Sequence, residues 1–179
     1  MIIAFTAVTV VLNPRFSEIA IPSFVPTLWF QIWEIAVVAA FFLLGLKSGI
    51  AIALLNTAVL VVVSPGIPFN KPLANLVAIL STLLGVYVAF KLVCRTSSKE
   101  MPTPRRKLVL FSTMLGIIFR LAIMMPFLYV SALLLTRPSA IVLLPLIAVY
   151  DLIVALYTVP LGYIVAKTVA QSLKLSSKV

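Results

Sequence analysis

Three ionisable side chains, Glu34, Arg120 and Asp151, lie inside long apolar stretches of the chain. A charge near the centre of a bilayer costs about 2.5–3.5 kcal/mol even on lenient scales, so each of these groups needs a partner or water. If the stretches form antiparallel helices, Arg120 and Asp151 lie at depths that differ by only about 6 Å, within reach of an arginine side chain. The sequence therefore predicts a structural ion pair between Arg120 and Asp151. Direct contact of either residue with a ligand is the alternative.

A second group of polar and aromatic residues is expected near one end of the predicted helices. Such convergent groups between helices are typical of small-molecule sites, and the proline-rich segment 13–26 is placed to cover them. The other interpretation is a belt of interfacial aromatic residues with polar helix ends, above all for Trp29. The predicted substrate-binding residues are Gln31, Trp33, Glu34, Asn75, Tyr129 and Tyr150.

The composition indicates that lipid, and not water, surrounds most of the chain. Hydrophobic residues make up 63% of the 179 residues and charged residues 10%, which leaves too little polar surface for a soluble globule. We expect an all-α membrane protein with a single transmembrane domain over residues 1–179, folded as a compact bundle of six helices. The first helix would be only about 18 Å long, short of a hydrocarbon core of about 30 Å. The predicted spans are 1–13, 31–46, 48–64, 73–94, 108–135 and 139–170.

Basic residues orient this bundle. Between Lys91 and Lys107 six basic residues face one acid, Glu100, and the positive-inside rule places this loop in the cytoplasm. The turn Lys47-Ser48-Gly49 and both termini then also lie in the cytoplasm, in a multi-pass protein of the plasma membrane. The net charge of +10 comes from helix ends and loops, without the continuous basic face that nucleic acid requires. No nucleic-acid partner is expected.

Catalytic chemistry has little support in the sequence. The chain has no histidine and a single cysteine, which excludes histidine-based triads and thiolate metal sites. No glycine-rich loop ends in the lysine of a phosphate-binding motif, so any ATP must be used by a partner subunit. We expect no metal and no cofactor bound by this chain.

Small residues recur every four positions on three predicted helices, a spacing that lets helices approach closely in lipid. Packing within the bundle is the simpler explanation, and docking to a partner is the other. The three sets are Gly49, Ala53 and Thr57; Ser81, Gly85 and Ala89; and Gly162, Ala166 and Ala170.

The order of these features resembles the substrate-binding S components of energy-coupling factor (ECF) vitamin transporters, and the riboflavin-type members are the most similar. A short helix and a proline-rich outer loop precede Leu28–Ala36, and an apolar run then leads to Gly45–Gly49. In the family, a hydrophobic and acidic signature leads in the same way to a glycine-flanked turn. The segments Pro72–Leu76 and Gly116–Arg120, with Met124 and Tyr129, are similar to the family's fourth and fifth helices.

Departures from the riboflavin-type pattern concern the substrate and the docking helix. Ala36 and Leu46 stand where the family has proline, and Leu128, Ile147 and Tyr150 stand where it has polar residues. The resemblance implies riboflavin or a related flat heteroaromatic compound, and these departures argue against riboflavin itself. The family docks through an Ala-x-x-x-Ala face of the first helix, where this chain has Ala4 and Ala7, with Val8 at the fourth position.

The resemblance implies capture of a vitamin-like compound from outside the cell and its delivery inward. The partners would be a transmembrane scaffold subunit and two ATPases that consume ATP, and the loaded S component would reorient in the bilayer when it docks. The alternative is a structural or assembly subunit of a membrane complex that binds no ligand. A membrane enzyme ranks third.

Overall fold

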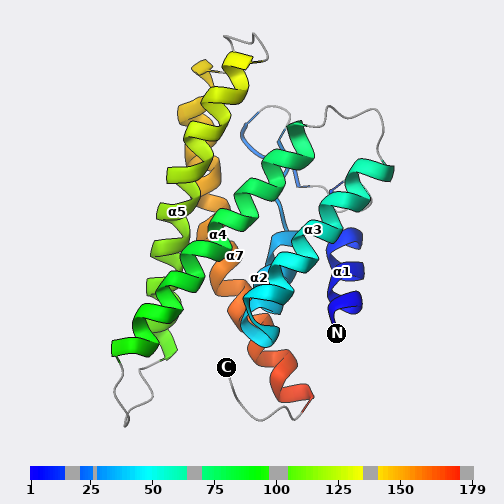
Figure 1. Cartoon of the computed structure of the whole chain (residues 1–179), viewed down its shortest axis with the longest axis vertical. Coiled ribbons are helices and arrows are strands. Elements are labelled where there is room, and N and C mark those ends of the chain that lie inside the picture. Colours follow the sequence, from blue (N-terminus) through cyan, green and yellow to red (C-terminus); the bar gives the residue numbers. More distant parts are fainter. Residues whose placement is uncertain (15–20, 26–27, 64–69, 97–104, 135–140, 174–179) are drawn as a thin grey trace.

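The computed structural model describes residues 1–14, 21–25, 28–63, 70–96, 105–134 and 141–173 (Figure 1). Within these ranges the chain forms six helices, which confirms the predicted all-α bundle. Arg15, Arg137, the loop 97–104 and the tail 174–179 lie outside the described residues. The helices are α1 (Ile2–Val11), α2 (Trp33–Leu44), α3 (Leu46–Val63), α4 (Asn70–Thr96), α5 (Arg105–Leu134) and α7 (Leu144–Ser172).

The helices divide into a long and a short set. By length and composition, three described segments are able to cross a membrane: Pro72–Val93, Lys107–Leu134 and Leu144–Ser172. The other three apolar helices are shorter, and α1, with 10 residues, extends only about 15 Å. The predicted span 31–46 is longer than α2, which begins at Trp33 and ends at Leu44.

A single residue separates α2 from α3. Gly45 adopts φ 89°, a conformation that side-chain-bearing residues rarely adopt, and its N–H donates to the carbonyl oxygen of Phe41. The predicted turn at Lys47-Ser48-Gly49 is wrong in position, because these residues lie in the first turn of α3. The left-handed conformation of Gly45 reverses the chain two residues earlier.

Successive helices run in alternating directions, as Figure 1 shows. This alternation brings the α2–α3 turn, the end of α4, the start of α5 and the end of α7 to the lower half of that view. Lys47, Lys91, Lys107 and Lys167 belong to these segments. We call this the basic end of the bundle and the opposite one the outer end.

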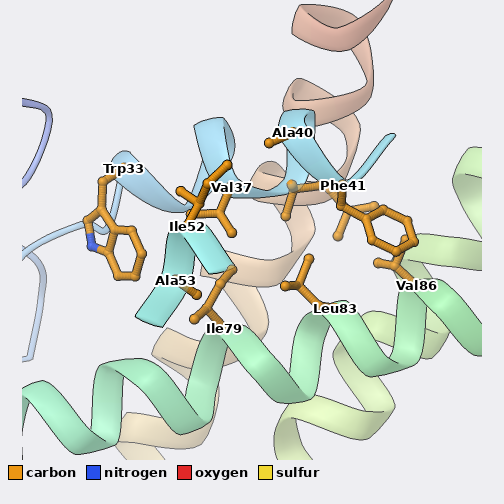
Figure 2. Close-up of a cluster of buried hydrophobic side chains, with 11 residues drawn as sticks. Trp33, Val37, Ala40, Phe41, Ile52, Ala53, Ile79, Leu83 and Val86 are labelled. Carbon is orange, nitrogen blue, oxygen red and sulfur yellow. The ribbon is translucent and has the colours of Figure 1, made fainter. Parts of the chain in front are cut away.

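The hydrophobic core is centred on α2, the shortest helix after α1. Trp33, Val37, Val38 and Ala40 of α2 are fully buried, and they pack with residues of α3 and α4 such as Ile52, Ile79 and Leu83 (Figure 2). The helix α7 packs along α2 from another side, and α4 runs along α5. Because neighbouring helices surround α2, a charge on this helix can be satisfied only within the bundle.

Two of the small-residue sets serve contacts inside the bundle. A Cβ atom added to Gly85 would lie 2.4 Å from the backbone oxygen of Leu115, so α4 and α5 touch here without a side chain between them. A Cβ added to Gly162 would lie 2.7 Å from Cγ1 of Val38, so α7 packs here directly against a side chain of α2. At these two glycines the simpler explanation, packing within the bundle, is confirmed.

Candidate functional site

Arg120, in the middle of α5, is the centre of a buried polar cluster. Its Nε donates a hydrogen bond to Asp151 Oδ1 on α7 at 2.8 Å. Its Nη1 and Nη2 donate to the two carboxylate oxygens of Glu34 on α2, at 2.6 Å and 3.2 Å. Nη1 also lies 3.3 Å from the hydroxyl of Thr82 on α4, which itself donates to the carbonyl of Ala78. One guanidinium group therefore links four helices; we call Arg120, Glu34, Asp151 and Thr82 the Arg120 cluster.

All four members of the Arg120 cluster are removed from solvent. Glu34 and Thr82 are 0% exposed, Arg120 1% and Asp151 2%. At such burial a charge is stable only when it is paired and hydrogen-bonded. The arrangement meets this requirement for the guanidinium and for Glu34, whereas Asp151 Oδ2 is buried and has no hydrogen-bond partner among the described residues.

The ion pair between Arg120 and Asp151 that the sequence suggested is thus present, but it is only part of the cluster. Glu34 was predicted to line the ligand pocket, whereas in the structure both of its oxygens accept hydrogen bonds from Arg120. The sequence did contain a signal for the contact between Glu34 and Arg120. Glu34 is the other acid inside a predicted span, and one guanidinium has enough donors for two carboxylates.

At the outer end of the bundle, residues 28–30 pair with residues 21–25. The N–H of Phe30 donates to Ile21 O at 2.9 Å, and the N–H of Ser23 donates to Leu28 O at 3.2 Å. The Tyr150 hydroxyl on α7 donates to the carbonyl oxygen of Trp29 at 2.6 Å and so fastens this segment to the helix. We call residues 21–25 and 28–30 the outer flap.

Aromatic rings form the contact between the outer flap and α7. Phe30 lies against Tyr150 and Tyr157, with ring centroids 5.9 Å and 6.2 Å apart, and Phe24 meets Tyr150 edge-on at 6.5 Å. Val25 of the flap is 2% exposed and packs with Tyr150 and Val154. The flap therefore closes over the first turns of α7, where Asp151 is located.

The predicted binding residues divide into two groups. Gln31, Trp33, Glu34 and Tyr150 come together at the outer ends of α2 and α7, where the Trp33 indole N–H donates to the Gln31 side-chain oxygen. Trp33 is nevertheless 0% exposed and belongs to the hydrophobic core. Asn75 on α4 is half-buried and Tyr129 on α5 is 47% exposed. No hydrogen bond of the described residues joins either of them to this group.

A separate apolar groove of about 420 Å³ lies between α1, α2 and the end of α7. Ala4, Phe5 and Val8 of α1 form one wall, while Ala36 of α2 and Val165 of α7 face them. None of the predicted binding residues lines this groove, and an apolar cleft between membrane helices suits a hydrocarbon chain or a helix better than a polar solute.

The comparison with known proteins was informative at the level of structure. No protein-family model matches the chain, and no curated protein matches its sequence. A solved structure described as the S component of a bacterial ECF transporter superposes with a TM-score of 0.75 at 22% sequence identity, over 97% of this chain and 95% of that one. The chain therefore has the fold of an ECF S component along its length.

Proposed function

We propose that this chain is the substrate-binding subunit of an ECF-type importer. The observation that carries the proposal is the likeness of nearly the whole chain to the S component of an ECF transporter. A fold shared over 97% of the chain, with six helices and an ordered segment over one end, suits a subunit that encloses a small molecule between helices.

The compound would be vitamin-like and flat, such as riboflavin or a related heteroaromatic molecule. Tyr150 and Gln31 lie at the outer end beneath the flap. A tyrosine ring such as that of Tyr150 stacks on planar ligands. Asn75 and Tyr129 complete the proposed lining from α4 and α5. Glu34 would act through Arg120, because both carboxylate oxygens bind the guanidinium.

The partners would be a transmembrane scaffold subunit and two ATPases, which supply the energy of transport. The apolar groove beside α1 contains Ala4 and Val8, two of the positions that the resemblance assigns to docking. The basic end would face the cytoplasm, because the positive-inside rule then accounts for Lys47, Lys91, Lys107 and Lys167. The outer flap would face the exterior of the plasma membrane.

A structural subunit without a ligand is the second candidate. The observation that favours it is the Arg120 cluster itself, in which the guanidinium binds two carboxylates of the same chain. Ion pairs of this kind also stabilise membrane bundles that bind nothing.

The two candidates differ in whether the purified protein carries a small molecule. The full chain is purified from its membrane, its bound compounds are extracted and identified by mass spectrometry, and binding of the identified compound is titrated. We expect Tyr150→Phe to weaken binding about two- to tenfold, since it removes one hydrogen bond from the closed flap. Tyr163→Phe, the same change on the part of α7 near Phe42, is the matched control and should bind normally. Absence of any enriched compound from wild-type protein would favour the structural subunit.

A further inference from the structure

The charges of the Arg120 cluster do not balance. One guanidinium faces two carboxylates, so the cluster carries a formal charge of −1 when all three groups are ionised. Lys47, Lys91, Lys107 and Lys167 belong to the basic ends of α3, α4, α5 and α7, and Lys71 lies in the first turn of α4. Among the described residues, Arg120 is the only cation paired with either carboxylate. An uncompensated charge buried between membrane helices is costly, so the cluster is expected to be neutralised, either by a proton on a carboxylate or by a cation that joins it.

The structure also shows where that counter-charge would bind. Three of the four carboxylate oxygens accept hydrogen bonds from Arg120. The fourth, Asp151 Oδ2, is buried and has no partner among the described residues. A buried acceptor without a donor is uncommon in folded proteins, and here it belongs to the group that holds the excess charge. A donor that carries positive charge would satisfy both needs at once.

Aromatic side chains lie on the same stretch of α7 as this oxygen. Tyr150 directly precedes Asp151, and Phe30 of the outer flap lies between Tyr150 and Tyr157. The faces of such rings attract cations. A carboxylate that shares one stretch of helix with aromatic side chains favours a flat, positively charged nitrogen heterocycle over a neutral or anionic one.

We propose that Asp151 Oδ2 and the rings of Phe30 and Tyr150 select a protonated, planar nitrogen heterocycle, whose N–H donates to Asp151. This inference rests on the proposed function, because it specifies the charge of the compound that the S-component fold would hold. Since Asp151 is 2% exposed under the closed flap, entry requires the outer flap to lift from α7. The bound cation makes the cluster neutral.

Two probes of nearly the same shape test the inference. 4-Aminoquinoline is protonated at neutral pH, and 1-aminonaphthalene is its neutral counterpart. Both are titrated by fluorescence into the full chain in lipid nanodiscs, with empty nanodiscs as the blank. We expect wild-type protein to bind 4-aminoquinoline at least about tenfold more tightly, and Asp151→Asn to abolish this preference. Thr158→Val, on the same helix, should retain it.

A second variant covers the case in which Asp151→Asn does not fold. Phe30→Leu removes a ring of the outer flap and should reduce the preference for 4-aminoquinoline about threefold or more. Equal binding of the two probes by wild-type protein, or binding of neither, overturns the inference, as does a preference that survives in folded Asp151→Asn. A neutral compound recovered from the purified protein would overturn it while leaving the proposed transport function intact.

Discussion

At the scale of single residues, one arginine organises the interior. Arg120 uses Nε for Asp151 and both terminal nitrogens for Glu34, so α2, α5 and α7 are held by charge-assisted hydrogen bonds. At the outer end of the bundle, the Tyr150 hydroxyl donates a hydrogen bond to the Trp29 carbonyl oxygen. The Arg120 cluster thus holds the helices together in the interior. The hydrogen bond from Tyr150 to Trp29 holds the outer flap over the site.

The first prediction concerns energetic coupling within the Arg120 cluster. Arg120→Met should destabilise the protein by about 3–5 kcal/mol, because it leaves two buried carboxylates without a partner. Asp151→Leu should then cost about 0.5–3 kcal/mol less in the Arg120→Met background than in wild type. Adding Glu34→Gln should recover further stability, since Glu34 is the last stranded acid.

Unfolding in detergent, followed by circular dichroism, measures this cycle. Combining Arg120→Met with Tyr163→Phe serves as the control and should be additive, because the Tyr163 ring packs on Phe42 and lies about 18 Å along α7 from Asp151. Additive losses for Arg120→Met and Asp151→Leu would mean that the ion pair contributes no coupling energy.

At the scale of helices, close approach depends on particular glycines rather than on every small residue. Gly85 lies against the backbone of α5, where an added Cβ would be 2.4 Å from Leu115 O. A Cβ added at Gly116 of α5 would lie 3.6 Å from Thr82 and Val86 on α4 and 3.5 Å from Val159 on α7, all ordinary contacts. Two glycines of one interface thus have different structural roles.

The second prediction follows from this difference. Gly85→Ala should destabilise the protein by about 1–3 kcal/mol, because α4 and α5 must separate to admit a methyl group. Gly116→Ala should be neutral or slightly stabilising, since alanine favours helices by up to about 1 kcal/mol over glycine and has room here. Thermal unfolding of the two variants under the same conditions measures this difference in stability. Equal effects would show that the α4–α5 distance is not limited by Gly85.

At the scale of the whole molecule, alternating helix directions separate a basic end from an outer end covered by the flap. The exceptions among the basic residues of the described helices are Arg120, buried in the middle of α5, and Lys71, in the first turn of α4. This asymmetry predicts one orientation in the membrane, with the basic end in the cytoplasm and the flap outside.

The third prediction tests this orientation by cysteine labelling. In a Cys94→Ala background, which removes the single native cysteine, Ser98→Cys should resist an impermeant thiol reagent in intact cells and react after the cells are opened. Ile21→Cys, at an exposed position of the outer flap, is the matched control and should react in intact cells. The reverse pattern would place the flap in the cytoplasm and contradict a site that captures a compound from outside.

The sequence by itself determined that lipid surrounds the chain, that the chain is helical, and which charged side chains inside the spans need partners. Apolar runs and rare charges suffice for this because a bilayer penalises each unpaired charge heavily, so Arg120 and Asp151 could be paired from helix depth alone. The tertiary structure decided which helix faces meet. That Glu34 joins Arg120 depends on the rotation of α2, and that Trp33 lies in the core depends on α3 and α4 beside it. The turn at Gly45 likewise follows from one backbone angle, which composition leaves undetermined.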